Sequence, residues 1–244
     1  MSQTSLKNAV AIVTGGSVGY GYGIANVLKQ RGARVYITAR NPERLQAAAD
    51  KLGVDAIAGD VTVPADWDRV VRAVLDDAGR VDVLVNNAGA GISIKPVVEL
   101  SDENIAATVA TNLTGVMYGC RRVAPLLKAQ GSGTIVNISS ICDSQAWPGY
   151  AVYGAAKAGL VSFSKHLYVE LRESGVRVTC LTPSWGATDF ASALGWERQD
   201  EHLRQRMTQP DELGEIVAQV CELPGHLVMP TLTVLPLVQD IVPF

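Results

Sequence analysis

The sequence predicts an α/β fold in which one doubly wound parallel sheet carries helices on both faces. Short apolar runs rich in β-branched residues alternate with amphipathic helical stretches along the chain. Most of these runs are apolar at consecutive positions, which is typical of parallel strands buried on both faces. Because the 244 residues contain no linker, low-complexity tract or internal repeat, we expect a single domain over 1–244.

Each element is predicted from its own stretch of sequence. Strands are expected at 10–13, 34–39, 55–58, 81–85, 134–138, 176–181 and 232–235. Helices are expected near 21–32, 42–52, 64–78, 102–130, 153–174 and 210–223. The helix at 42–52 has the clearest start, because Asn41 is a good N-cap, Pro42 suits the first turn and Glu43 lies near the positive end of the dipole.

Composition excludes several classes of protein. Hydrophobic residues make up 48% of the chain and charged residues 18%, which excludes intrinsic disorder. Lys and Arg number 21 against 24 for Asp and Glu, so no nucleic-acid partner is expected. The N-terminus lacks the apolar core of a signal peptide, and Pro230 and Pro236 interrupt the apolar stretch 227–238, so no membrane partner is expected.

No metal site or disulfide framework is predicted. The four cysteines are far apart in the sequence and form neither a C-x-x-C pair nor a cluster with histidine, and no histidine has a partner at metal-ligand spacing. Reduced, packed thiols are typical of cytosolic proteins, so we expect a cytoplasmic location.

A glycine-rich turn follows the first strand. The spacing T-G-x-x-x-G-x-G fits at Thr14, Gly15, Gly19 and Gly21, whereas G-x-G-x-x-G does not fit. A strand-to-helix turn without Cβ atoms lets backbone N–H groups and the helix dipole meet a pyrophosphate. The alternative is that the glycines serve only the packing of helix on strand.

Further motifs appear in a fixed order after this turn. They are Asp60-Val61, Asn86-Asn87-Ala88-Gly89, Asn112 within a helix, Ser139-Ser140 after the fifth strand, and Tyr153-x-x-x-Lys157. Together with the glycine turn, they resemble the motifs of the short-chain dehydrogenase/reductase family over nearly the whole chain. The resemblance implies a Rossmann-type fold that transfers hydride between a nicotinamide cofactor and a small-molecule secondary alcohol or carbonyl.

Tyr153 and Lys157 have the spacing that the chemistry needs. A carbonyl that accepts hydride also needs a proton, and residues four apart on a helix share a face. Tyr153 is the one tyrosine with a lysine four residues later. An ammonium there is expected to lower the phenol pKa, with help from the positive oxidised nicotinamide. The alternative is a half-buried core tyrosine and a solvated lysine.

The resemblance implies two further catalytic residues. Ser140, thirteen residues before Tyr153, would orient and polarise the carbonyl; Ser139 is the alternative for this role, but is expected to point into the sheet. Asn112 would help to hold a water in a proton relay to Lys157. Asn is a poor helix former, and the alternative is that it only distorts its helix.

The second strand indicates the type of nicotinamide. Relatives that prefer NAD place an acid at its end, on the ribose hydroxyls. Here Ala39 and Arg40 stand there, and a guanidinium can clamp a 2′-phosphate, so we expect NADP(H) in preference to NAD(H). Arg40 stacked on adenine would suit either cofactor, and Val18 replaces the basic residue that many NADP-using relatives carry in the glycine turn.

Most of the cofactor contacts are implied by the resemblance. Besides Arg40, Tyr153 and Lys157, they are Gly15, Ser17, Gly19, Tyr20, Gly21, Asp60, Val61, Asn87, Ala88, Gly89, Pro183 and Thr188. Ser184 replaces the glycine that usually follows the proline, so the contacts to the carboxamide stay open.

The C-terminal third suggests the substrate and the assembly. A substrate lid is expected near 185–207, and Trp147 and Tyr150 are expected to line a moderately apolar pocket. The tail, with L-P-x-H at 223–226 and P-x-x-Q at 236–239, resembles the NADP-dependent 3-hydroxy acid dehydrogenases, which favours a small hydroxy acid or ketone.

Rival functions and the assembly stay open at this stage. A catalytically idle NADP-binding sensor or scaffold is one alternative, and an epimerase or dehydratase is another; fold by itself does not decide function.

By resemblance we expect a homodimer or homotetramer built on the helices near 102–130 and 153–174. An apolar face for it would use Val109, Val116, Leu160, Phe163 and Leu167, unless these pack against the sheet.

Overall fold

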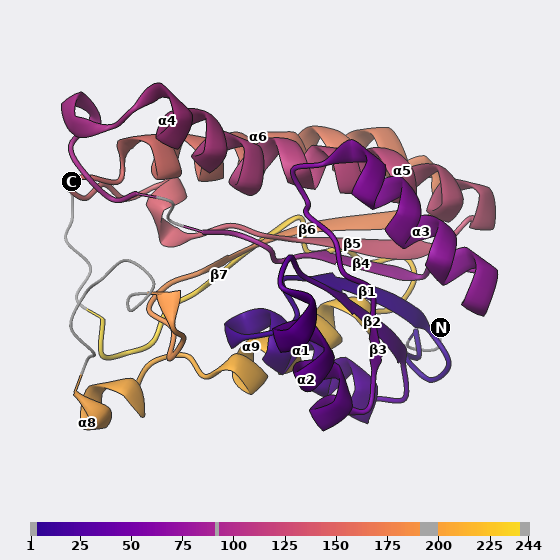
Figure 1. Cartoon of the computed structure of the whole chain (residues 1–244). Coiled ribbons are helices and arrows are strands. Elements are labelled where there is room, and N and C mark those ends of the chain that lie inside the picture. Colours follow the sequence, from indigo (N-terminus) through magenta and orange to yellow (C-terminus); the bar gives the residue numbers. More distant parts are fainter. Residues whose placement is uncertain (1–3, 91–92, 191–199, 240–244) are drawn as a thin grey trace.

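The computed structural model describes residues 4–90, 93–190 and 200–239, and its centre is one parallel sheet (Figure 1). Its strand order is β3-β2-β1-β4-β5-β6-β7, and every neighbouring pair is parallel. The strands are β1 (Val10–Thr14), β2 (Arg34–Thr38), β3 (Asp55–Ala56), β4 (Val83–Asn86), β5 (Gly133–Ile138), β6 (Val176–Pro183) and β7 (Thr231–Val234). The predicted fold class is confirmed.

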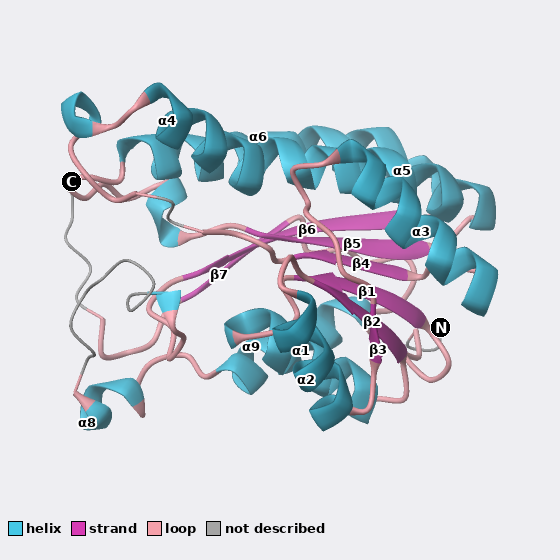
Figure 2. Cartoon of the chain, in the orientation of Figure 1, coloured by secondary structure: helices cyan, strands magenta, loops and turns pink. Residues whose placement is uncertain are grey.

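Helices cover both faces of the sheet (Figures 1 and 2). One face carries α1 (Gly19–Gln30), α2 (Pro42–Leu52) and α9 (Pro210–Cys221). The other carries α3 (Pro64–Ala78), α5 (Gly115–Gln130) and α6 (Ala151–Leu171), with α4 (Asp102–Val109) beside α6. Shorter helical segments are η1 (Val97–Glu99), η2 (Ala110–Thr114), η3 (Ile141–Asp143), η4 (Arg172–Ser174) and α8 (Glu201–Arg204).

Strand β1 shows why consecutive positions are apolar. Ala11 and Val13 pack into the cluster beneath α1, α2 and α9, whereas Val10 and Ile12 pack into the cluster beneath α3, α5 and α6. All five residues of β1 are buried. Because successive side chains of a strand point to opposite faces, burial on both faces makes every position apolar.

The helix boundaries agree with the predictions at several places. α2 and α3 span the predicted residues, and the Asn41 side chain accepts a hydrogen bond from the Arg44 backbone N–H at 2.8 Å, as expected of an N-cap. The helix expected over 102–130 differs, because the π-helical segment η2 separates α4 from α5. Propensity does not encode such a register change, which here contains Asn112.

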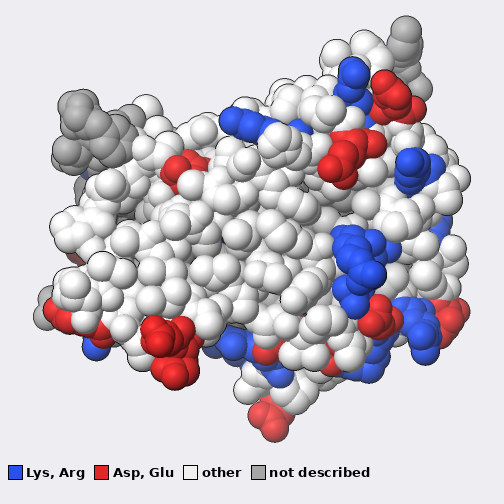
Figure 3. Space-filling model, turned by 90° about the horizontal axis from the view of Figure 1, so that it is seen from above, with Lys and Arg blue, Asp and Glu red and all other residues white. Residues whose placement is uncertain are grey.

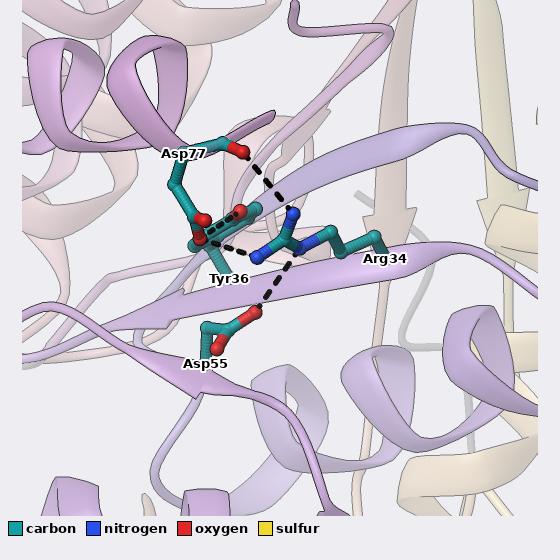
Figure 4. Close-up of polar contacts among 4 residues, drawn as sticks. All are labelled: Arg34, Tyr36, Asp55 and Asp77. Atoms are coloured by element: carbon teal, nitrogen blue, oxygen red, sulfur yellow. Dashed lines mark hydrogen bonds and ion pairs between the residues drawn. The ribbon is translucent and has the colours of Figure 1, made fainter. Parts of the chain in front are cut away.

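A polar cluster joins β2 and β3 to the end of α3 (Figure 4). The Tyr36 hydroxyl donates to Asp77 at 2.7 Å, and the Arg34 guanidinium pairs with Asp77 and lies 5.2 Å from the centre of the Tyr36 ring. Arg34 also contacts Asp55 at 3.4 Å. Burial, with the neighbouring Asp77, raises the pKa of Tyr36. The cluster lies near the start of β2. It therefore supports the sheet on the side away from the carboxyl ends of the strands.

Candidate active site

The predicted site residues lie after the carboxyl ends of neighbouring strands. The glycine turn follows β1, Asn87–Gly89 follow β4, Ser139 and Ser140 follow β5, and Ser184–Thr188 follow β6. The strand order reverses between β1 and β4, and ligands of open α/β sheets bind at such a switch point. The topology therefore brings motifs that are distant in sequence to one edge.

Ser140 and Tyr153 meet at this edge. Ser140 has an extended backbone before η3, its Oγ accepts from the Cys142 N–H at 3.3 Å, and its hydroxyl is hydrogen-bonded to that of Tyr153. The Tyr153 side chain projects from the first turn of α6 and is 8% exposed. The predicted hydroxyl pair is thus assembled by β5 and α6.

Lys157 lies one turn further along α6. Its Nζ donates to the Ile138 carbonyl at 2.9 Å and lies 5.7 Å from the centre of the Tyr153 ring. The side chain is buried, and burial lowers its pKa from 10.5 to about 8. The ammonium therefore faces the tyrosine, as the four-residue spacing predicts.

Burial dominates the electrostatics of Tyr153 in the protein alone. Burial raises the phenol pKa above its ordinary value, and the hydrogen bond from Ser140 offsets only part of that effect. Lys157 by itself does not reverse it. In the protein alone Tyr153 is a neutral phenol, and acidification requires a further positive charge at the site.

Asn112 lies in the π-helical segment η2 and is fully buried. Its Nδ2 donates to the carbonyls of Ala90 and Thr108 at 2.8 and 2.9 Å, and its Oδ1 accepts from the Ala90 N–H at 3.2 Å. The side-chain amide is thus occupied by backbone groups. Asn112 thereby ties η2 to the backbone of Ala90.

Gly89 lies between Asn112 and Lys157. A Cβ at Gly89 would lie 3.0 Å from Asn112 Oδ1 and 3.3 Å from Lys157 Nζ. Both polar groups therefore converge on this glycine. The three residues, which we predict from three separate segments of the sequence, lie next to one another.

The glycine turn forms a cradle without side chains. Gly15 and Gly19 have φ values of +66° and +54°, which favour glycine. A Cβ at Gly21 would lie 2.3 Å from the Gly15 carbonyl oxygen, so glycine is required there too. Backbone N–H groups at the start of α1 suit a pyrophosphate, and Ser17 lies half-buried within the turn. The residues therefore fit a dinucleotide.

Thr14 joins this turn to β4, a role that motif reading did not assign. Its Oγ1 accepts from the N–H groups of Asn87 and Ala88 at 3.0 and 2.9 Å. The Asn87 amide returns a hydrogen bond to the Thr14 carbonyl at 2.9 Å. The signal for this role in the sequence is the position of Thr14 as the first residue of the glycine motif.

The adenine side of the edge contains Arg40 and Asp60. Arg40 is exposed just after β2, and no hydrogen bond or ion pair holds its guanidinium within the described part of the chain. Asp60 Oδ1 accepts from the N–H and hydroxyl of Thr62 at 2.9 and 2.8 Å, which fixes the turn that contains Val61. The Thr38 hydroxyl is buried without a partner nearby, next to Gly59.

Tyr20 lies in the glycine turn, but its side chain points into the protein. Its hydroxyl donates to the Ser184 carbonyl at 3.3 Å and is hydrogen-bonded to Thr208. A Cβ at Gly186 would lie 2.1 Å from this hydroxyl. Only the Tyr20 backbone is thus left for the cofactor contact that we predict.

The segment after β6 begins with Pro183 and reaches Thr188, whose side chain lies beside Gly19. The ring of Phe190 lies 5.9 Å from that of Tyr153, a contact that the sequence did not indicate. The predicted lid, 185–207, falls partly on 191–199, which lie outside the described residues.

The aromatic residues Trp147 and Tyr150 lie beside Tyr153, because the ring of Tyr150 contacts Tyr153 and that of Trp147 contacts Tyr150. Tyr150 stacks edge-on against Tyr153, with ring centres 6.1 Å apart. Both residues also line a cavity of about 300 Å³ whose α6 wall is formed by Ala151, Gly154, Ala155 and Ala158. These positions lie on the side of the helix away from Tyr153 and Lys157, so this cavity is not the predicted substrate pocket.

Within the described residues, no group of three or more His, Cys, Asp or Glu is placed to hold a metal ion. All four cysteines are free thiols, and three of them are buried. None of the helices in residues 4–90, 93–190 and 200–239 is long and apolar enough to cross a membrane.

Comparison with known proteins identifies the family. The short chain dehydrogenase family model matches residues 9–199. An NADP-dependent 3-hydroxy acid dehydrogenase of Salmonella typhi is 33% identical over 95% of this chain and 96% of its own. The closed form of serine dehydrogenase complexed with NADP+ has a TM-score of 0.87 and 31% identity, covering 96% of this chain and 98% of that chain.

Another similar solved structure contains NADH in place of NADP+. A 3-ketoacyl-(acyl-carrier-protein) reductase from Brucella melitensis complexed with NADH has a TM-score of 0.87 and 31% identity, and covers 94% of this chain and 98% of that chain. The family match, the parallel sheet and the motif order agree. The chain belongs to the short-chain dehydrogenase/reductase family of oxidoreductases.

Proposed function

We propose that this protein is an NADP(H)-dependent oxidoreductase that interconverts a secondary alcohol and a carbonyl compound. One observation carries the proposal: the Ser140 and Tyr153 hydroxyls are hydrogen-bonded to each other, and the Lys157 ammonium lies 5.7 Å from the Tyr153 ring. A catalytically idle sensor would have no use for this arrangement.

Each side chain has a distinct part in the reaction. The nicotinamide supplies or accepts the hydride when the cofactor is bound. Ser140 orients and polarises the substrate oxygen, and Tyr153 donates the proton that the developing alkoxide needs. Because burial raises its pKa, Tyr153 holds this proton at neutral pH. Lys157 holds the ribose and lowers the cost of forming the phenolate, and Asn112 positions the backbone beside it.

The cofactor preference rests on Arg40. Its exposed guanidinium, with no partner in the described part of the chain, suits a 2′-phosphate. The relative from Salmonella typhi is named as NADP-dependent, and serine dehydrogenase was solved with NADP+. Gly15, Ser17, Gly19, Tyr20 and Gly21 would hold the pyrophosphate. The remaining contacts would come from Asp60, Val61, Asn87, Ala88, Gly89, Pro183 and Thr188.

The test is NADPH oxidation with a panel that contains small 3-keto and 3-hydroxy acids and neutral ketones. Tyr153→Phe should reduce kcat by about 10³-fold or more, because the proton donor is lost while the cofactor site is intact. Tyr168→Phe, on the same helix but away from the site, is the matched control. A wild-type protein that binds NADPH but turns over no carbonyl would instead indicate a sensor or scaffold.

We further propose a homodimer or homotetramer in which α6 lies at the interface. The face above α4, α5 and α6 has few charged side chains over its middle (Figure 3). Ala151, Ala155 and Ala158 of α6 are exposed. Three members of the predicted face, Val116, Leu160 and Leu167, instead pack in the core against the sheet. Sedimentation velocity would measure the assembly.

The predicted cytoplasmic location and the preference for small hydroxy acids or ketones also belong to this proposal. Each has support from the sequence alone: the free thiols for the location and the tail motif for the substrate. The substrate panel tests the latter directly.

A further inference from the structure

Asp143 links the ends of two strands at the active site. It is the last residue of η3, which begins directly after Ser140. Its Oδ2 accepts hydrogen bonds from the hydroxyls of Ser139 and Thr182, both at 2.9 Å. Ser139 follows β5, and Thr182 belongs to β6. The carboxylate therefore closes the turn that carries Ser140 and fixes it to the neighbouring strand.

The same link reaches Lys157. The Ser139 hydroxyl also lies 3.3 Å from the Lys157 carbonyl oxygen, and Lys157 Nζ donates to the Ile138 carbonyl at 2.9 Å. Asp143, Ser139 and Lys157 thus form one connected group around the end of β5. A change in Asp143 acts both on the Ser140 turn and on the start of α6.

The charges around Lys157 single out Asp143. No carboxylate within the described residues forms an ion pair with the Lys157 ammonium. The acidic groups that act on it are the thiols of Cys142 in η3 and Cys180 in β6, and the carboxylate of Asp143. On α6 itself the neighbouring titratable group is Tyr153, and η2 contributes the neutral Asn112.

Two of these three acidic groups, the thiols, are neutral at neutral pH. Burial raises the pKa of the Cys142 thiol, and it raises the pKa of Cys180 to about 11. Burial also keeps the Tyr153 phenol protonated. Among the acidic groups that act on Lys157 in the described part of the chain, this leaves the Asp143 carboxylate to oppose the cost of burying the ammonium.

We propose that Asp143 is a positioning residue of this active site: it fixes the Ser140 turn through Ser139 and Thr182, and it supplies the negative charge that balances the buried Lys157 ammonium. This inference rests on the proposed function for its catalytic meaning. The charge itself favours protonated Tyr153 as well, because a nearby anion opposes formation of the phenolate.

The Lys157 ammonium can be titrated without any substrate. Protein labelled with ¹³Cε-lysine gives the pKa of Lys157 by NMR, with Lys157→Arg to assign the signal. Asp143→Asn keeps a hydrogen-bond acceptor and removes the charge, so the pKa of Lys157 should fall by about one pH unit. Should that variant fail to fold, Asp143→Thr makes the same comparison.

Three further variants separate charge from position. Asp143→Glu keeps the charge and should leave the Lys157 titration within about 0.3 pH unit of wild type. Ser139→Ala should do the same, but should lower kcat about tenfold because the Ser140 turn loses one anchor. Asp50→Asn, on α2 across the sheet, removes a charge at a distance and should change neither quantity.

A Lys157 titration in Asp143→Asn that matches wild type would overturn the inference, and so would an equal shift in Asp50→Asn. The pH dependence of kcat/KM provides the second readout. The pH at which kcat/KM changes should be lower in Asp143→Asn than in wild type, and should stay unchanged in the other variants. Absence of turnover in the wild type would contradict the proposed function, yet would leave the NMR comparison intact. The two failures are therefore distinguishable.

Discussion

Lys157 Nζ donates a 2.9 Å hydrogen bond to the carbonyl of Ile138, the last residue of β5. This bond ties the buried ammonium of α6 to the strand that leads into Ser139 and Ser140. The lysine is thus oriented by the backbone and not by an acidic partner. Its burial has measurable consequences for stability as well as for catalysis.

The free energy of unfolding should depend on pH through Lys157. Its pKa is about 8 in the folded protein, below the ordinary 10.5, so between these values the unfolded chain holds a proton that the folded chain has lost. Stability from this group therefore rises with pH across that window. Relative to Lys157→Met, wild type should gain about 2–3 kcal/mol between pH 7 and pH 10.

Urea unfolding of both proteins at several pH values measures this gain. The buried thiols of Cys120 and Cys221, whose pKa values are raised without any contribution from Lys157, oppose it equally in both proteins and cancel in the difference. Exposed Lys165→Met is the matched control and should show a flat difference from wild type. A flat difference for Lys157→Met as well would refute the proposed burial cost.

Arg40→Asp should move the cofactor preference toward NADH. The change removes a cation from the end of β2 and places a carboxylate there, which repels a 2′-phosphate and can accept hydrogen bonds from ribose hydroxyls. The ratio of kcat/KM for NADPH to that for NADH should fall by about 100-fold.

Arg44→Asp provides the comparison for Arg40→Asp, because Arg44 is exposed on α2 and already pairs with Asp189 at 3.8 Å. It should alter the ratio much less. An unchanged ratio in Arg40→Asp would defeat the assignment of Arg40 to the phosphate.

Asn112→Ala should reduce both stability and turnover. It leaves the Ala90 N–H and the carbonyls of Ala90 and Thr108 without their side-chain partner in a buried place. We expect a loss of about 2–4 kcal/mol in the free energy of unfolding. Asn104→Ala on α4, where the side chain is only half-buried, should cost less than about 1 kcal/mol. Equal losses would show that the Asn112 contacts contribute nothing.

Gly23→Ala should destabilise the fold by separating α1 from α9. A Cβ at Gly23 would lie 2.2 Å from the Pro210 carbonyl carbon, which belongs to the backbone and cannot move like a flexible side chain. The clash should outweigh the better helix propensity of alanine and cost about 2–3 kcal/mol. Gly225→Ala, which would meet nothing within 4 Å, should stay within about 0.5 kcal/mol of wild type in thermal unfolding.

Some placements in the site follow from local features of the sequence. Tyr153 and Lys157 could be paired from their spacing, because helix geometry places residues four apart on one face. Arg40 could be placed at the edge where we expect the cofactor, because it lies two residues after the end of a parallel strand. Both arguments are local, and neither needs knowledge of how distant segments pack.

Other features of the site depend on contacts between distant segments. The role that we propose for Asp143 depends on its hydrogen bond with Thr182. Phe190 belongs to the site because its ring contacts that of Tyr153. The pKa of Tyr153 could not be derived from its lysine neighbour, because burial outweighs a single charge. Likewise, the predicted interface residues Val116, Leu160 and Leu167 proved to belong to the core.

The amino-acid sequence by itself determined the class of fold, the order of strands and helices and the residues that we propose to carry the chemistry, because periodicity and motif spacing are properties of neighbouring residues. Only the tertiary structure decided the π-helical turn at Asn112, the direction of the Tyr20 side chain and the charge balance around Lys157. These depend on burial and on partners from other strands, which arise only when the chain has folded.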